Sequence, residues 1–401
     1  MKIRLAVILP SCDFVNRRGL MNAALCRLEQ LERMPEYDID VYALKTEYRQ
    51  YRFGDLCRGE ISCMDIHVDG RVIHQLTKVE YRSSNRLLRK PLKLYHRYAR
   101  QRLCDWEWQK RFAKYVKGYD AVTVHFNDAA IIAESVHRRF GTPYFVTWHG
   151  SDIHTIPFND PAAKEKTIQC IEHAACNFFV SKALLEISDR LTKNGKKEVL
   201  YNGVDGQFIK YELLKRERLR QNLGVEDVKV ITFVGNLRSV KNADKLPDIF
   251  EKIQEGCAGK VFFWIIGDGD QKSAIEAKLS RMNIDCVLWG NQPHESIPDF
   301  LNCTDILILP SKNEGLPLVA LEALSCGANV VGSMVGGIPE VIGDDFCVPI
   351  DGSFVDSFAQ KVIEVLQIHP IQLLKGCFSW RDTATKENTI YSQKVYEAKK
   401  E

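Results

Sequence analysis

Short apolar runs alternate along the chain with stretches whose apolar residues recur at helical spacing. Leu5–Leu9, for example, precedes apolar positions between Leu20 and Leu31 that suit one face of a helix. Runs of this length bounded by turn residues are typical of buried strands, and strand-loop-helix repeats predict βαβ units. The expected strands are residues 5–9, 40–44, 121–125, 144–149, 177–181, 199–201, 230–234, 261–266, 287–289, 306–309, 329–332 and 346–349. This pattern predicts an α/β fold.

The strand and helix repeats form two series, separated by a charged, mostly helical stretch. Because 401 residues exceed what most single hydrophobic cores contain, this stretch is predicted to link two domains. The predicted organisation is a first domain at 1–205, a linker at 206–227, a second domain at 228–375 and a C-terminal helix at 376–401. The apolar run at the N-terminus is too short for a signal peptide and ends at Pro10, so it is interpreted as a strand.

The stretch Ser311–Gly327 carries the strongest candidate chemistry. It follows a predicted buried strand, and Pro317 is expected in the first turn of a helix, where its missing N–H costs nothing. Glu314 lies in the loop, and Glu322 lies in a helix that is apolar on nearly every side. A buried carboxylate needs hydrogen-bond donors, and the N–H groups at a helix start attract an anion. One ligand with a phosphate and sugar hydroxyls meets both needs; the alternative is that Glu322 pairs with a lysine or arginine.

The order P-S, E-G-x-P and Glu314-x7-Glu322, followed by Gly336-Gly337-Ile338-Pro339-Glu340, resembles the donor-site motif of family 4 (group 1) retaining glycosyltransferases. The resemblance implies the GT-B fold, with two facing Rossmann-like domains and a C-terminal helix that crosses back to the first. It also implies that Glu322 holds a ribose and Glu314 holds hydroxyls of the transferred sugar. The backbone at Gly315, Leu316, Leu318 and Val319 would face the diphosphate.

The loop after the first strand of the second domain also matches the family. The resemblance implies that Arg238 and Lys241, beyond Gly235, bracket the diphosphate and stabilise the departing charge. The family's arginine directly follows the glycine, whereas Asn236 stands there in this chain. Surface charge is the alternative reading. The backbone near Asn291 corresponds to the family's contact with the nucleobase.

In the first domain, His149-Gly150-Ser151-Asp152 resembles the family's H-G-x-D segment. The position of His149 at a strand end implies contact with the transferred sugar, and Asp152 is a candidate acceptor or phosphate contact. His125 also ends a strand, and only its location supports a role. Arg18 stands where the family commonly has a glycine, and Gly19 keeps one; Arg18 either meets a phosphate or is solvated.

Residues 78–117 are strongly basic, with thirteen lysines and arginines against three acidic residues and with aromatic residues interleaved. Such a segment is typical of contact with an anionic membrane surface. A solvated helix or a nucleic-acid patch are the alternatives, and no nucleic-acid motif accompanies the charge.

Composition limits the remaining classes. The thirteen cysteines are scattered without a C-x-x-C, which fits a reducing cytosol and gives no zinc or redox framework. No apolar run is long enough to span a bilayer. No metal is expected. No Asp-x-Asp is expected in a loop that could bind a metal, and Lys241 and Arg238 can supply the positive charge that a metal would provide.

The predicted function is therefore the transfer of a sugar, with retention, from a UDP-linked donor to an acceptor hydroxyl. The expected acceptor is a surface polysaccharide or a lipid-linked glycan, and the expected location is the cytoplasm, with peripheral contact to the inner face of the membrane. An epimerase or phosphorylase of the same fold, or a non-catalytic nucleotide-sugar binder, remain as alternatives.

Overall fold

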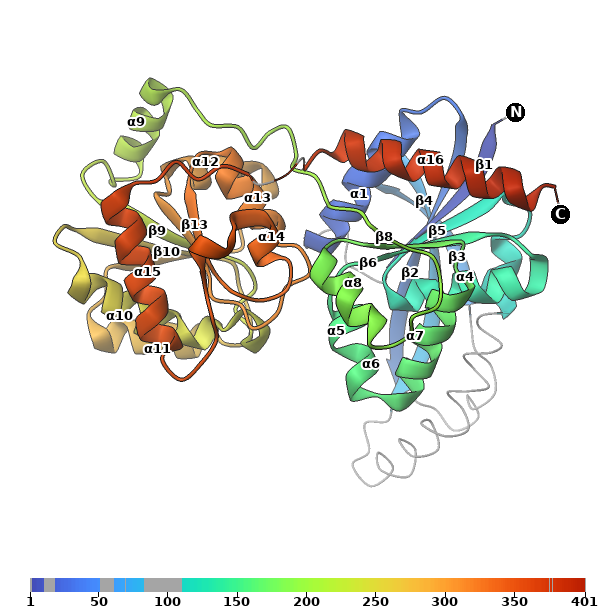
Figure 1. The fold of residues 1–401 in the computed structure, drawn as a ribbon, viewed down its shortest axis with the longest axis horizontal. Coiled ribbons are helices and arrows are strands. Elements are labelled where there is room, and N and C mark those ends of the chain that lie inside the picture. The colour runs from blue at the N-terminus through green and yellow to red at the C-terminus, as the bar shows by residue number, and fades with distance from the viewer. Residues whose placement is uncertain are drawn as a thin grey trace. The chain divides into compact units, whose positions relative to one another are not determined.

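The computed structural model describes residues 2–10, 19–50, 61–68, 70–82, 110–374, 376 and 378–400. It divides into two units: Met1–Val180, Leu184–Leu200 and Thr383–Glu401 form the first, and Ser181–Ala183 with Tyr201–Asp382 form the second (Figure 1). Arg18 and most of the basic segment, including Arg86, Arg89, Lys90 and Lys93, lie outside the described residues.

The first unit is built on an eight-stranded sheet in the order β3-β4-β2-β1-β5-β6-β7-β8. Its strands are β1 Ile3–Leu9, β2 Tyr37–Gln50, β3 Ile61–Val68, β4 Arg71–Arg82, β5 Ala121–His125, β6 Tyr144–Trp148, β7 Cys176–Phe179 and β8 Lys197–Val199. All neighbours are parallel except β3, which runs antiparallel to β4. Its helices are α1 Gly19–Glu32, α4 Asn127–Phe140, α5 Ser151–His154, α6 Ile156–Asn159, α7 Pro161–His173, α8 Lys182–Asp189 and α16 Trp380–Ala398.

The C-terminal helix α16 completes the core of the first unit. Its buried residues Ala384, Tyr391 and Val395 pack with Val7 of β1 and Phe145 of β6 in one apolar cluster. Figure 1 shows the helix lying along the sheet of this unit, as the GT-B resemblance implies. The unit therefore buries residues from both ends of the chain in a single core.

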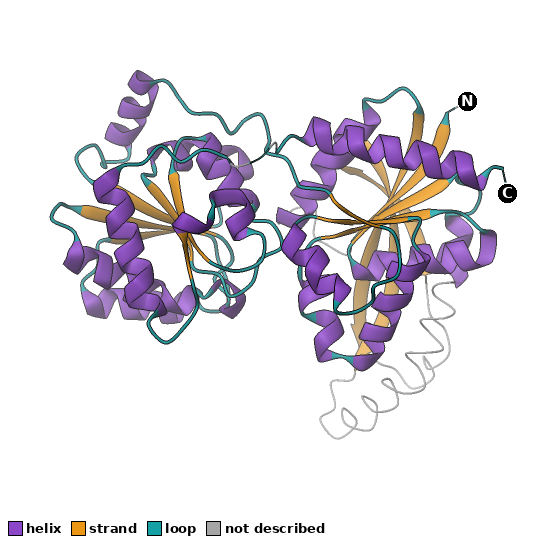
Figure 2. Ribbon diagram, in the orientation of Figure 1, coloured by secondary structure: helices purple, strands orange, loops and turns teal. Residues whose placement is uncertain are grey.

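The second unit is built on a six-stranded parallel sheet in the order β11-β10-β9-β12-β13-β14. The strands are β9 Lys229–Val234, β10 Val261–Ile266, β11 Cys286–Gly290, β12 Ile306–Leu309, β13 Asn329–Ser333 and β14 Cys347–Val348. The helices are α9 Leu213–Asn222, α10 Leu246–Gly256, α11 Lys272–Met282, α12 Ile297–Cys303, α13 Leu318–Ser325, α14 Ile338–Ile342 and α15 Phe354–Ile368, with 3-10 turns at Ser239–Lys241, Ala243–Lys245, His294–Ser296 and Asp344–Phe346. Figure 2 shows the helices of both units surrounding their sheets.

This strand order is that of a Rossmann fold, in which the order reverses between β9 and β12. Ligands of open α/β sheets bind beyond the carboxyl ends of the strands at such a reversal. The loops after β9 and β12 carry Gly235–Lys241 and Ser311–Pro317, so the topology alone marks the predicted donor loops.

The structure agrees with most of the predicted strands. β5, β10 and β12 have the predicted bounds, but β3 and β4 were not predicted. Helix α13 begins at Leu318, and Pro317 precedes it in an extended conformation rather than forming its first turn. Within the predicted linker at 206–227, Arg216 and Arg220 of α9 form ion pairs with Asp305 of the second unit.

Candidate functional site

The loops at the carboxyl edge of the second sheet are tied together through their backbones. The N–H of Lys312 donates to the carbonyl of Val240 at 2.9 Å, which joins the loop after β12 to the loop after β9. The N–H of Leu237 donates to the carbonyl of Asp268 at 3.0 Å, which joins the loops after β9 and β10. These bonds hold the predicted donor loops at the strand-order reversal.

The two glycines of the G-G-x-P-E segment, Gly336 and Gly337, lie against the backbone of the Glu314 loop. A Cβ atom on Gly336 would lie 1.9 Å from the carbonyl oxygen of Glu314, and one on Gly337 would lie 2.2 Å from that of Gly315. Gly336 also has a φ of +52°, and the N–H of Gly337 donates to Gly315 at 3.0 Å. Only glycine allows this close approach, so the segment supports the backbone of the Glu314 loop.

Lys241 and Glu314 form an ion pair at the strand-order reversal. The Nζ atom of Lys241 lies 2.5 Å from Oε1 of Glu314, and the hydroxyl of Ser311 donates to the same oxygen at 2.7 Å. Ser311 is fully buried, and Ser333 donates in turn to its carbonyl. The structure thus brings together a cation and a carboxylate that are 73 residues apart in sequence.

The remaining residues predicted for the donor site lie at the same edge. Gly235 and Arg238 lie in the loop after β9, and the Arg238 side chain is exposed and forms no ion pair within the part of the chain that is described. Leu318 and Val319 are half-buried at the start of α13, which has no side-chain cap at Pro317. The first N–H groups of a helix lack intrahelical partners, so these groups are available to an anion. Asn291 is exposed directly after β11.

Glu322 lies in α13 with its carboxylate withdrawn from solvent, although the residue keeps some accessible surface. Burial is the main reason that its pKa is raised to about 8, and the nearby carboxylate of Asp205 raises it further. No hydrogen bond or ion pair to this carboxylate occurs among the described residues, so the predicted alternative of a lysine or arginine partner is not found. Asp205, in the N-G-V-D segment, was not predicted as a neighbour of Glu322.

The first unit presents a different set of groups at its carboxyl edge. Asp152 is fully buried, and its carboxylate accepts hydrogen bonds from the N–H groups of His149, at 3.1 Å, and Gly150, at 2.7 Å. Burial raises its pKa to about 6, and these N–H groups oppose that rise. Asp152 therefore shapes the H-G-S-D loop from within, which is a different position from the expected acceptor contact.

His149 is paired with His125, the residue that ends β5. The Nδ1 atom of His125 lies 3.0 Å from Nε2 of His149, and the two rings stack with centroids 5.3 Å apart. Burial, together with the smaller effect of the Arg27 charge, lowers the pKa of His149 to about 3. Burial, His149 and Arg27 also lower the pKa of His125 well below its ordinary value. Both imidazoles are therefore neutral near pH 7, and one must donate to the other.

A buried ionic network lies in the same unit. Arg27 of α1, 1% exposed, pairs with Glu387 of α16, and the Tyr391 hydroxyl donates to Glu387 at 3.0 Å. Tyr391 also lies within hydrogen-bond distance, 2.8 Å, of the Thr123 hydroxyl on β5. Sequence analysis did not predict this network, since its partners are up to 360 residues apart.

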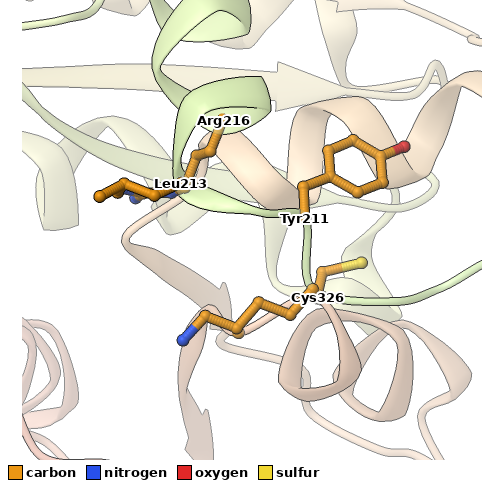
Figure 3. A pocket seen from close by; sticks show the side chains of 6 residues that line it. Tyr211, Leu213, Arg216 and Cys326 are labelled. Carbon is orange, nitrogen blue, oxygen red and sulfur yellow. The ribbon is translucent and has the colours of Figure 1, made fainter.

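A surface cavity of about 370 Å³ lies elsewhere in the second unit (Figure 3). Its lining residues are Lys210, Tyr211, Leu213, Arg216, Cys326 and Gly327. Figure 3 shows Leu213 and Arg216 on the α9 side and Cys326 beside the end of α13. None of the predicted site residues lines it, and it lies at the opposite end of α13 from Leu318.

The expectation of no Asp-x-Asp in a loop is wrong, because Asp268-Gly269-Asp270 follows β10. The Asp268 carboxylate accepts from the N–H of Gly269 at 2.7 Å and from Lys272 at 3.4 Å. Gly19 is the first residue of α1, whereas the loop before it lies outside the described residues.

The two Rossmann-like sheets and α16 define the GT-B class of glycosyltransferase fold. Solved structures agree: HepE of Anabaena in complex with UDP and glucose aligns with a TM-score of 0.67 over 99% of this chain and 100% of that one, at 16% identity. The sucrose-phosphate synthase of Thermosynechococcus elongatus aligns with a TM-score of 0.64 over 98% and 99%, also at 16% identity. Likeness at this identity establishes the fold.

The sequence of the second unit points to a family. Residues 215–373 match the family model described as glycosyl transferases group 1, so this part of the chain is similar to that family, as the motifs of the sequence indicate. The N-acetyl-alpha-D-glucosaminyl L-malate synthase of Bacillus anthracis is 31% identical over 49% of this chain and 51% of its own length. A protein of Bacillus subtilis named as a teichuronic acid biosynthesis glycosyltransferase, TuaC, is 28% identical over 56% and 55%. The chain thus spans about half the length of these curated relatives.

Proposed function

We propose that the chain transfers a sugar, with retention of configuration, from a UDP-linked donor to an acceptor hydroxyl. The observation that carries this proposal is the Lys241–Glu314–Ser311 cluster at the strand-order reversal, next to the uncapped start of α13. A cation and free backbone N–H groups suit a diphosphate, and a carboxylate held by a buried serine suits sugar hydroxyls.

Each residue has a role in this proposal. Lys241 and Arg238 bind the diphosphate and stabilise the charge that develops on it as the bond to the sugar breaks. The backbone from Gly315 to Val319 adds N–H donors, and Glu322 binds the ribose. Glu314 moves from its ion pair with Lys241 to the hydroxyls of the sugar, because the diphosphate then neutralises the lysine.

His149 is proposed to bind the transferred sugar as a neutral imidazole. Its low pKa supports this role, since a neutral ring neither repels nor attracts the positive charge that builds up at the reacting carbon. The cations of the loop after β9 support a reaction without a metal, because they supply the charge that a metal would otherwise provide.

The experiment that tests this function is a screen of nucleotide sugars for hydrolysis and transfer by the whole chain, with and without EDTA. We expect slow release of UDP from one donor, unaffected by EDTA, and a product with the donor's anomeric configuration. Binding of a donor without turnover would favour a nucleotide-sugar binder, and inversion would contradict the retaining assignment.

The proposed acceptor is a surface polysaccharide or a lipid-linked glycan. The relative named for teichuronic acid biosynthesis and the basic character of residues 78–117 support this choice. Within the described residues, no helix combines the length and apolar character needed to cross a bilayer. Contact with the membrane would therefore depend on the basic segment, where each cation contributes about 1 kcal/mol near an anionic surface.

Cosedimentation with anionic vesicles tests this contact. Binding should be clear at low salt and fade as salt is added, because screening acts over about 10 Å. Reversing Arg86, Arg89, Lys90 and Lys93 to glutamate should abolish binding and leave donor hydrolysis intact. A wild-type chain that ignores anionic vesicles at low salt would point to a soluble anionic acceptor.

A further inference from the structure

The edge hairpin of the first unit brings three metal-ligating side chains to one face of the sheet. Cys63 and Asp65 are two residues apart on β3, so their side chains project from the same face. The antiparallel register places His74 of β4 directly opposite Asp65, and Leu76 opposite Cys63. His74 is thus the direct neighbour of Asp65 and the diagonal neighbour of Cys63, and both are within side-chain reach.

The distances between the polar atoms match this register. Nδ1 of His74 lies 2.7 Å from Oδ1 of Asp65, and the ligand atoms of Cys63, Asp65 and His74 all lie within 4.8 Å of one another. On the other side of His74, the ring of Tyr42 packs against the imidazole with centroids 5.1 Å apart. The parallel register of β2 and β4 pairs Tyr42 with His74, so the backbone fixes this contact. The imidazole is therefore held between an aromatic ring and a carboxylate.

The donor set favours one class of metal. Thiolate, imidazole and carboxylate are the ligands of Zn²⁺ in proteins, whereas Mg²⁺ and Ca²⁺ require oxygen ligands throughout. Three protein ligands leave the fourth tetrahedral position to water, and the partial exposure of these side chains gives solvent access. An ordinary surface ion pair explains Asp65 and His74, but it gives no reason for a thiol beside them.

We propose that Cys63, Asp65 and His74 form a Zn²⁺ site that ties the edge strand β3 to β4. An edge strand is held by a neighbour on one side only, so a metal crosslink stabilises it more than it would a central strand. This site is separate from the proposed donor site, and its test does not depend on the proposed function.

The experiment uses the whole chain, reduced and stripped of metal with EDTA, titrated with ZnCl₂ and with CoCl₂. We expect one equivalent of Zn²⁺ by calorimetry and a thiolate-to-cobalt charge-transfer band. Cys63→Ser and His74→Gln should each weaken Zn²⁺ binding by about tenfold or more, and Cys63→Ser should remove the band. Met64→Ser is the matched control, because Met64 lies between the two β3 ligands on the opposite face.

Two results would overturn the proposal. One is Zn²⁺ binding that is as tight in Cys63→Ser and His74→Gln as in the wild type, which shows an adventitious ion elsewhere. The other is a Co²⁺ complex without the thiolate band in the wild type. Circular dichroism of each variant establishes that it is folded, and His74→Gln keeps the test valid if the serine variant misfolds.

Discussion

Arg27–Glu387 and Lys241–Glu314 are ion pairs in different units, and they differ most in their exposure to solvent. The side chains of the first pair keep 1% and 2% of their accessible surface, and those of the second keep 27% and 11%. A charge buried beyond the reach of water is costly without its partner, whereas a partly exposed charge is rehydrated or binds a ligand. We infer that the first pair serves stability and the second serves ligand binding.

The surroundings of the two pairs support the same distinction. Arg27 and Glu387 join α1 to α16 beside an apolar core, and the Tyr391 hydroxyl donates to Glu387. Lys241 and Glu314 lie in loops at the carboxyl edge of a sheet, next to backbone groups that an anion can use. The two pairs also differ in whether the sequence identifies them, because only Lys241 and Glu314 lie in motifs that the family resemblance identifies.

Glu387→Ala gives the largest expected effect on stability. It should lower the free energy of unfolding of the first unit by about 3–5 kcal/mol, because it leaves the Arg27 charge buried and unpaired. Urea denaturation followed by circular dichroism measures this loss.

Two further variants sharpen this result. Glu397→Ala, on the exposed side of the same helix, should leave the midpoint unchanged. The double variant Arg27→Met, Glu387→Leu should recover most of the loss, because a well-packed apolar pair replaces a buried ion pair at little cost. If Glu387→Ala unfolds at the same urea concentration as the wild type, the buried pair does not stabilise the first unit, and the proposed distinction between the two ion pairs is wrong.

Lys241→Ala is expected to leave stability nearly unchanged and to lower donor turnover by roughly a hundredfold or more. The reason is that a preorganised charge aimed at the developing negative charge is lost. The rate is measured with the donor found by the nucleotide-sugar screen, and calorimetry compares nucleoside with nucleoside diphosphate.

Only diphosphate binding should weaken in Lys241→Ala. Lys252→Ala, an exposed lysine on α10 that pairs with Asp356, is the control and should retain full turnover. An equal loss of affinity for nucleoside and diphosphate would instead indicate that the second unit is misfolded.

Glu322→Ala should weaken binding of the nucleoside diphosphate by about 1–3 kcal/mol, as expected when one partner of buried hydrogen bonds is removed and the other is left unsatisfied. Calorimetric titration measures it, and an unchanged affinity in a folded variant would remove Glu322 from the ribose site.

The same carboxylate gives a test by pH. The folded-state pKa of about 8 lies above the ordinary value of 4.5, so the unfolded state loses its proton first as pH rises. The contribution of protonated Glu322 to the free energy of unfolding is therefore complete below about pH 4.5 and is lost as pH rises through about 8. Glu322→Gln cannot ionise, so it should gain stability relative to the wild type between these limits. A difference that does not change with pH would show that the Glu322 carboxylate is well solvated.

The sequence predicted those parts of the fold and site that depend on local pattern. The strands β5, β10 and β12 and the loop position of Glu314 follow from short apolar runs and turn residues. The strands β3 and β4 were missed because the predicted strands are all short continuous apolar runs, whereas apolar residues alternate with polar ones in β3 and β4, as is typical of strands with one exposed face.

Contacts set by tertiary structure could not be predicted in this way. The pairing of Arg27 with Glu387 depends on α16 packing onto α1, and the closeness of Asp205 to Glu322 depends on how the N-G-V-D segment meets α13. The role of Asp152 depended on loop geometry, since its spacing alone did not reveal that its carboxylate accepts from the backbone of its own loop.

The smallest expected effect concerns His125 and separates the neutral site of the first unit from the charged site of the second. His125→Phe keeps a ring but removes the hydrogen bond to His149, so it should lower turnover by roughly fivefold to tenfold, the value of about one hydrogen bond. His125→Asn should retain most of the activity, because its amide reaches the position of Nδ1. The KM for the donor should stay within about twofold of the wild type.

His137→Asn, on the neighbouring helix α4, is the control and should not change the rate. Because the pKa of about 3 keeps the His149 imidazole neutral above pH 5, this ring should contribute no inflection to the rate between pH 5 and 8. Equal losses of turnover in His125→Asn and His125→Phe would show that the hydrogen bond between the two histidines does not set the orientation of His149.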